Sequence, residues 1–424
     1  MKEFLKRLPA ELQDLINLAG EIAAKSNTPA YLVGGFVRDL ILQVRNLDLD
    51  IVVEGDGINF AGELAERLRV KIVRHTRFGT ATVIFAHNLK IDITSAREEC
   101  YPEPACLPLV KNGKVKDDLK RRDFTINAMS ISLNSQDYGK LVDFFGGIDD
   151  LRNRKIRVLH DLSFIDDPTR ILRAVRFEQR YNFHIEPKTL KLLKAAVKIK
   201  MLEKVQPQRL RDELILMLKE ASVIKQVKQL QSLTGLKFIN PHLKVGVESY
   251  KLLKAVDGSI AWFMKECARS RHLDAWLIYF MVLLDGIKID QIRKIFKAFV
   301  FRKGEEKRIL DYKKIDNNSL SLLNKKSVKP SQIYKLLNPL SYETILLLKS
   351  KYKGKNLSRN IECFLKKYHT MRIHVTGSDL FDLGIAQGPF FKKVFSRVLI
   401  AKLDGLVNTK EEELSLVKKL AKLK

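Results

Sequence analysis

The chain has 424 residues, a length that predicts more than one domain. Lysine and arginine number 77 and aspartate and glutamate 49, so the net charge is +28, which indicates a polyanionic partner such as a nucleic acid. The hydrophobic content of 46% excludes a mainly disordered basic chain. The longest apolar run, Ala275–Leu284, is shorter than the roughly 18 residues of a membrane span.

The expected compartment is the cytoplasm, with no membrane association and no evident protein partner. The N-terminal residues lack the apolar core of a signal peptide. The 4 cysteines show no C-x-x-C spacing, so they predict neither a zinc site nor a disulfide framework.

The first 150 residues predict a mixed α/β domain. Short β-branched runs predict strands at Tyr31–Val33, Leu49–Val53, Thr80–Phe85 and Lys90–Thr94. An amphipathic pattern predicts a helix at Asn59–Leu68. Glycines separate these segments, as is typical of turns between short elements.

From about Pro168 onward the pattern is helical almost throughout, and isolated prolines mark helix boundaries. Helices are predicted at Leu273–Leu284 and Phe390–Leu403, and the polar, lysine-rich segment Asp311–Lys329 is the best candidate for a flexible joint. We therefore expect three regions: an α/β domain at 1–150, a helical region at 151–245 and a second helical region at 246–424.

Two carboxylates stand two residues apart on a predicted strand. Side chains at this spacing emerge on one face, so Asp48 and Asp50 would repel each other unless a cation such as Mg²⁺ bound them. Asp92 lies in another predicted strand and could complete a two-metal site if the two strands are neighbours. Taken alone, a D-x-D pair is more often a solvated strand edge.

A glycine pair precedes these carboxylates. Gly34 and Gly35 would let backbone N–H groups approach phosphates, and Arg38 follows about one helical turn later. Taken alone, a glycine pair is usually only a turn.

The motifs are more informative in combination. The order of a strand, G-G-x-x-R-D and then D-x-D resembles the nucleotidyltransferase signature of the DNA polymerase β superfamily. Further segments resemble the motifs of class II tRNA nucleotidyltransferases and their poly(A) polymerase relatives: Lys120–Met129, Asp143–Gly147, Asp166–Phe177 and Arg209–Glu213.

This resemblance implies an α+β fold, with an N-terminal polymerase-β-like nucleotidyltransferase domain followed by an elongated, all-helical neck, body and tail. It implies an enzyme that adds C and/or A to the tRNA 3′ end from CTP and ATP, with Mg²⁺ as cofactor. The basic helical part would hold tRNA by its shape and backbone charge.

The resemblance also implies roles for the residues near the glycine turn. Asp48 and Asp50 would bind the metal ions and be catalytic, while Gly35 and Arg38 would hold the triphosphate. Three residues of the second motif would contact the sugar or phosphates of the nucleotide: Arg122, Asp123 and Asn127. Asp123 could equally be the N-cap of a helix at Phe124–Met129.

Asp167 and Arg170 are candidates for reading the base. Cytosine and adenine both present an exocyclic amine donor beside a ring-nitrogen acceptor, whereas uracil and guanine present the reverse. A carboxylate that accepts from the amine and a guanidinium that donates to the ring nitrogen would therefore accept C and A together. The alternative is that Asp167 is a helix N-cap, since Pro168 fits the first helical position.

The neighbouring arginines of the same motif are also candidates. Arg173 would contact the triphosphate or the base, and Arg176 is either functional or paired with Glu178 or Asp212. In the last motif Gln208 replaces the usual glutamate, while Arg209 and Glu213 remain at i,i+4 spacing and would brace the helices around the base pocket.

The sequence leaves open which nucleotides are added. Family members add CCA, CC, only A or poly(A), and Ala96–Asp118 lies where CCA-adding members have a flexible loop. A non-catalytic RNA-binding relative and a small-molecule nucleotidyltransferase are the alternative functions. Retention of Asp48, Asp50 and Arg38 argues against the first, and the large basic helical part argues against the second.

Overall fold

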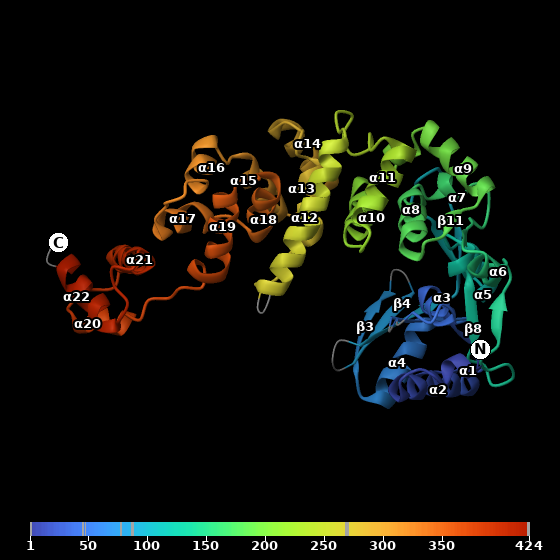
Figure 1. The fold of residues 1–424 in the computed structure, drawn as a ribbon. Coiled ribbons are helices and arrows are strands. Elements are labelled where there is room, and N and C mark those ends of the chain that lie inside the picture. Colours follow the sequence, from blue (N-terminus) through green and yellow to red (C-terminus); the bar gives the residue numbers. More distant parts are fainter. Residues whose placement is uncertain are drawn as a thin grey trace. The chain divides into compact units, whose positions relative to one another are not determined.

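The computed structural model describes residues 2–44, 46, 48–76, 79–85, 89–267 and 271–421. The chain forms two compact units, Met1–Phe238 and Ile239–Lys424, each described here by itself (Figure 1). Within the described residues, every helix is too short or too polar to cross a membrane. The division of the first unit into an α/β region and a helical region at residue 150 stays a prediction.

A seven-stranded mixed sheet forms the centre of the first unit, in the order β3-β4-β5-β2-β1-β8-β9. Its strands are β1 Ala30–Val33, β2 Leu49–Val53, β3 Lys71–His75, β4 Thr80–Ile84, β5 Lys90–Ser95, β8 Met129–Ser132 and β9 Leu141–Asp143. All the predicted strands are confirmed, whereas the sequence pattern does not predict β3, β8 or β9. β2 pairs with β5 in parallel and places Asp50 directly opposite Asp92.

Two smaller sheets lie outside this central sheet. An antiparallel hairpin joins β6 (Arg97–Cys100) to β7 (Leu109–Asn112), and a short parallel pair joins β10 (Lys155–Ile156) to β11 (His184–Ile185). The hairpin occupies the segment that the family resemblance assigns to a flexible loop.

The helices of the first unit are α1 Lys2–Leu5, α2 Ala10–Lys25, α3 Gly35–Ile41, α4 Gly57–Leu68, α5 Val115–Lys120, α6 Gly147–Arg152, α7 Ser163–Asp166, α8 Arg170–Tyr181, α9 Pro187–Lys198, α10 Pro207–Leu218 and α11 Val223–Thr234. The predicted helix at Asn59–Leu68 is confirmed as α4, which the Asp56 carboxylate caps by accepting from the N–H groups of Ile58 and Asn59. Its buried face, which includes Phe60 and Leu64, packs against β4 and β5, and α2 lies beside it (Figure 1).

The predicted helix at Phe124–Met129 is wrong. The chain makes only a short 3₁₀ turn at Thr125–Asn127 and then enters β8. Ile126 and Met129 are fully buried, so tertiary packing rather than helical periodicity decides the local structure.

The second unit is all-helical, with α12 Val247–Glu266, α13 Ala275–Leu283, α14 Ile289–Phe299, α15 Lys303–Lys313, α16 Asn317–Leu323, α17 Pro330–Leu337, α18 Tyr342–Lys351, α19 Lys355–Cys363, α20 Gly377–Asp382, α21 Pro389–Leu403 and α22 Lys410–Ala421. Both predicted helices are confirmed, as α13 and α21. The predicted flexible joint at Asp311–Lys329 is wrong, because α16 lies within it and buries Leu320 and Leu323.

Candidate active site

One cavity of about 980 Å³ in the first unit contains most of the predicted site. Its walls come from α3, β2, the β6–β7 hairpin, α8 and α10. Among the residues that line it are Gly35, Arg38, Asp48, Asp50, Arg122, Asp123, Asn127, Asp167, Arg170, Arg173 and Arg176. The structure therefore brings together residues that are far apart in the sequence and for which the sequence predicts metal, phosphate or base contacts.

Two of the three predicted metal carboxylates, Asp48 and Asp50, line this cavity, whereas Asp92 is not among its lining residues. Burial raises the pKa of Asp50 to about 6; Arg122 opposes this shift, and the nearby charges of Asp92 and Asp48 add to it. Carboxylate oxygens are the ligands that Mg²⁺ prefers, and these carboxylates repel one another when they are all charged. A divalent cation bound between them would relieve this repulsion.

Asp92 is the less direct candidate ligand. Its carboxylate accepts a hydrogen bond of 2.6 Å from the Thr82 hydroxyl. Across the described part of the chain, no group of three or more His, Cys, Asp or Glu side chains is arranged to hold a metal. Two carboxylates are nevertheless enough for Mg²⁺, because substrate phosphates and water commonly supply its other ligands.

Gly34 is required at the turn for two reasons. Its φ of +72° lies in the left-handed region, and a Cβ atom at this position would lie 2.6 Å from Arg122 Nη1. Arg122 in turn donates to Asp118 at 2.9 Å. The glycine thus lets Arg122 approach the backbone next to Asp50.

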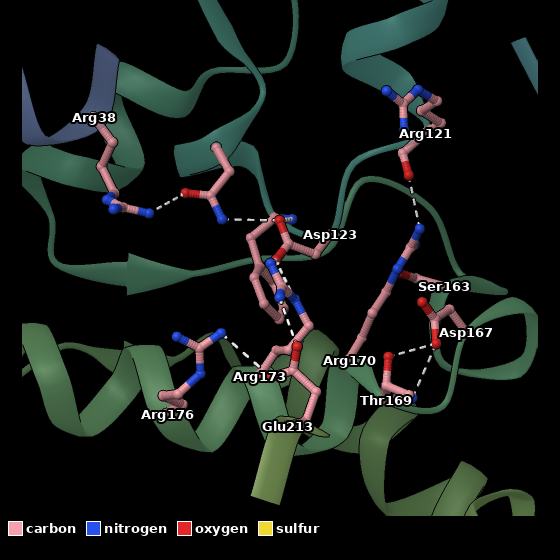
Figure 2. A network of polar contacts seen from close by, with 12 residues as sticks. Arg38, Arg121, Asp123, Ser163, Asp167, Thr169, Arg170, Arg173, Arg176 and Glu213 are labelled. Atoms are coloured by element: carbon pink, nitrogen blue, oxygen red, sulfur yellow. Dashed lines mark hydrogen bonds and ion pairs between the residues drawn. The ribbon is translucent and has the colours of Figure 1, made fainter. Parts of the chain in front are cut away.

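A chain of hydrogen bonds joins the arginines to Asp123 (Figure 2). Arg38 donates to Asn127 Oδ1 at 2.5 Å, and Asn127 donates to Asp123 Oδ1 at 2.8 Å. Arg173 donates twice to Asp123 Oδ2, at 2.8 Å from Nε and 2.6 Å from Nη2. Although burial opposes it, the Arg173 charge and these hydrogen bonds lower the pKa of Asp123 to about 2. The N-cap alternative for Asp123 is wrong, because the predicted helix is absent and the 3₁₀ turn has Phe124 at its N-cap.

Asp123→Asn should lower the free energy of unfolding by about 3 kcal/mol, because it removes one of the two carboxylates that pair with the Arg173 guanidinium and leaves only Glu213. Urea unfolding would measure this loss. The matched control is Asp149→Asn, which removes an exposed ion pair of 3.5 Å with Arg152 and should cost less than about 1 kcal/mol. Equal costs for the two variants would contradict the structural importance of the buried pair.

Glu213 braces α10 against α8, as predicted. It accepts from Arg173 Nη1 at 2.8 Å and from Arg176 Nη2 at 3.2 Å. Arg176 is therefore ion-paired, but with Glu213 and with Glu220 at 3.7 Å rather than with the predicted Glu178 or Asp212.

Asp167 and Arg170 both line the cavity, and each has fixed partners (Figure 2). Asp167 Oδ1 accepts from the N–H and hydroxyl of Thr169, and Oδ2 accepts from Arg209 Nη2 at 2.7 Å. Arg170 donates to the Ser163 hydroxyl at 2.6 Å and to the Arg121 carbonyl at 2.7 Å. The Asp167 carboxylate thus stabilises a turn immediately before α8 and also lines the cavity. The prediction that Asp167 is the N-cap is wrong, because Thr169 is the N-cap residue of α8.

Sequence reasoning missed several residues that hold the arginines in place. Asp118 is fully buried and pairs with both Arg121 and Arg122, at 2.7 and 2.9 Å. Glu99 on the hairpin accepts from Arg121 at 3.0 Å. The only available signal was the run of charges Asp117–Asp123, and such a run usually indicates a solvated helix face.

Some polar atoms of the cavity walls remain unused. Arg122 Nε, Arg176 Nε and Arg209 Nη1 are buried and lack a hydrogen-bond partner among the described residues. Buried donors of this kind are rare in proteins, and all three belong to cavity-lining arginines. A bound anion would supply acceptors at this wall.

Family models match two parts of the chain. Residues 30–157 match the poly A polymerase head domain, and residues 182–246 match a probable RNA- and SrmB-binding site of polymerase A. An A-adding tRNA nucleotidyltransferase of Halalkalibacterium halodurans is 33% identical over 412 residues, which cover 94% of this chain and 90% of that protein. The chain belongs to the class II tRNA nucleotidyltransferase and poly(A) polymerase family. The resemblance stated from the motifs is therefore confirmed.

Two further relatives show how far this similarity extends. An A-adding tRNA nucleotidyltransferase of Geobacter sulfurreducens is 35% identical over 98% of this chain, which spans only 48% of that longer protein. The Thermotoga maritima CCA-adding enzyme, solved in complex with tRNA, is 35% identical with a TM-score of 0.73 and covers 100% of this chain and 98% of its own. The predicted fold class, an α/β nucleotidyltransferase domain followed by helices, is confirmed.

Proposed function

We propose that this chain is a template-independent tRNA nucleotidyltransferase that adds C and/or A to the tRNA 3′ end. The observation that carries this proposal is that one cavity is lined both by Asp48 and Asp50 and by several arginines. The full-length similarity to tRNA nucleotidyltransferases supports tRNA as the substrate. Such an enzyme would act in the cytoplasm.

The cavity offers a site for each part of a nucleotide. Asp48 and Asp50 would hold Mg²⁺, which supplies charge neutralisation at the α-phosphate and a lowered pKa for the attacking hydroxyl. Arg38 and Arg122 would bind the phosphates, with Gly35 at the start of α3 allowing close approach. Asn127 would approach the ribose.

The base would lie beside Asp167 and Arg170, which line the same cavity. The donor and acceptor pattern of this pair suits C and A and disfavours U and G. Arg173 and Arg176 would then frame the pocket, held by Asp123 and Glu213.

The addition of A alone is the finer proposal that the relatives favour. Three relatives that match 81–98% of this chain are named A-adding tRNA nucleotidyltransferases. A CC-adding relative of Deinococcus radiodurans matches only 43% of it. Solved neighbours named CCA-adding enzymes, at 35% identity, keep full CCA addition as the competing outcome.

Incubation with defined tRNA ends tests this proposal. Transcripts lacking all of the CCA end, its last two nucleotides or its last nucleotide are each mixed with one labelled NTP. Incorporation of ATP only into the transcript that ends in CC would establish A addition, and stepwise incorporation of CTP and then ATP would establish CCA addition. Long A tracts would indicate a poly(A) polymerase, and no incorporation at all would contradict the proposed function.

The affinity for tRNA should fall roughly a thousandfold or more between about 50 and about 200 mM salt, as for proteins that contact six or more phosphates. The net charge of +28 is the reason, because each neutralised phosphate releases counterions. Fluorescence anisotropy with labelled tRNA at several salt concentrations measures the slope. A flat profile would mean that the positive charge of the chain does not contribute to tRNA binding.

A further inference from the structure

Asp39 is a buried carboxylate at the centre of a cluster next to the proposed phosphate site. It is 1% exposed and accepts two hydrogen bonds from its neighbour Arg38, at 2.8 Å from Nε and 2.9 Å from Nη2. Asn46 Nδ2 donates to it at 2.8 Å, and the Tyr181 hydroxyl donates to it at 3.1 Å. These donors come from α3, from the segment before β2 and from α8, so one carboxylate ties three parts of the chain together.

The same cluster fixes the Arg38 guanidinium in place. Its charge lies over the ring of Tyr181, with 4.7 Å to the centroid, and over the ring of Phe177 at 5.3 Å. Asp39 thus accepts hydrogen bonds from the edge of the guanidinium, and the two aromatic rings make cation–π contacts with its face. Arg38 has little freedom to move away from the cavity.

Asn46 links the buried Asp39 cluster to Asp48. Its Nδ2 group donates to Asp39, and its Oδ1 accepts the backbone N–H of Asp48 at 2.9 Å. A side-chain amide can do both at once because it has a donor and an acceptor. Asp48 itself is exposed and lies immediately before β2, outside the strand.

We infer that Asn46 is a positioning residue for Asp48. Asp39 binds Arg38, the proposed phosphate ligand, directly, and it binds the backbone of Asp48, the proposed metal ligand, through Asn46. The two proposed ligands are thereby fixed relative to each other. The inference rests on the proposed function for the role of Asp48. It assigns a role to Asn46, which lies outside the G-G-x-x-R-D and D-x-D motifs. Partners that orient metal ligands from outside the coordination shell are typically worth about 10- to 100-fold in affinity or activity.

The test is direct binding of Mn²⁺ to the full chain without nucleotide, measured by electron paramagnetic resonance of the free ion. Asn46→Ala should weaken Mn²⁺ binding roughly tenfold while the thermal midpoint stays close to that of the wild type. The matched control is Asn59→Ala, since Asn59 is an exposed asparagine of the same unit that lies outside the cavity. Asn46→Gln retains both amide functions and should recover part of the affinity.

The dependence of nucleotide addition on Mg²⁺ gives a second readout. In Asn46→Ala the half-saturating Mg²⁺ concentration should rise, while the rate at saturating Mg²⁺ returns close to that of the wild type. A merely structural role would instead lower the thermal midpoint and reduce the rate at every Mg²⁺ concentration. Unchanged Mn²⁺ affinity and unchanged Mg²⁺ dependence would overturn the inference.

Asp48→Ala separates a failure of this inference from a failure of the proposed function. If the wild type binds Mn²⁺ that Asp48→Ala removes, but adds no nucleotide to any tRNA, the proposed function fails and Mn²⁺ binding by Asn46→Ala decides the inference alone. If Asp48→Ala leaves Mn²⁺ binding unchanged, Asp48 is not a ligand and the inference is overturned.

Discussion

Replacing Asp48 or Asp50 with alanine should abolish nucleotide addition and leave tRNA affinity nearly unchanged. The two carboxylates lie on and next to β2 and line the cavity, and burial and like charges raise the pKa of Asp50 to about 6. Removing a metal ligand takes away transition-state stabilisation of several kcal/mol, which lowers the rate by at least about a thousandfold. Binding to tRNA should persist, because it depends on the net charge of +28 over the whole chain rather than on these two residues.

Single-turnover incorporation and tRNA anisotropy on the same preparations would measure both parts of this result. The control is Asp14→Ala, since Asp14 is an exposed aspartate on α2 away from the cavity. Asp92→Ala, made in parallel, decides whether the carboxylate opposite Asp50 is a third ligand. If both Asp48→Ala and Asp50→Ala kept more than a few per cent of the wild-type rate, the metal assignment would be wrong.

The strands could be predicted where the local sequence and the tertiary fold favour the same structure. The β-branched run Leu49–Val53 forms β2 with the predicted bounds, and its central position buries almost every side chain. Met129–Ser132 forms β8 without such a run, because pairing with β1 and β9 decides its conformation. Similarly, the polar segment Asp311–Lys329 contains the helix α16, because two of its leucines supply buried contacts.

At the site, the candidate functional residues could be predicted from the sequence, but their hydrogen-bond and ion-pair partners could not. Residue types and motif order were enough to select side chains that share one cavity, because phosphate, metal and base each demand particular groups. The partners of those side chains could not be predicted in the same way. Asp118 orients Arg122 from within one helix turn, whereas Glu213 reaches Arg173 across 40 residues of sequence. Such pairings exist only after the helices have packed.

Asp167→Ala should change which nucleotide is used rather than only how fast it is used. If Asp167 accepts from the exocyclic amine of C or A, its loss removes one buried hydrogen bond and lowers discrimination against UTP and GTP by about 10- to 100-fold. Arg170→Ala should instead slow the use of both C and A, because both bases present the same ring-nitrogen acceptor. A four-NTP incorporation assay on each variant measures these profiles.

The structure sharpens the alternative, because Asp167 also accepts from the Thr169 N–H just before α8 and pairs with Arg209. If Asp167 only stabilises that turn, its loss should lower stability by about 1 kcal/mol and leave the NTP profile intact. Arg209→Ala serves as the companion variant, since it removes the ion pair while keeping the carboxylate and the turn. A relaxed profile in Asp167→Ala together with a retained preference for C or A in Arg209→Ala would establish that the carboxylate reads the base. A lowered thermal midpoint with an unchanged profile in Asp167→Ala would eliminate that role.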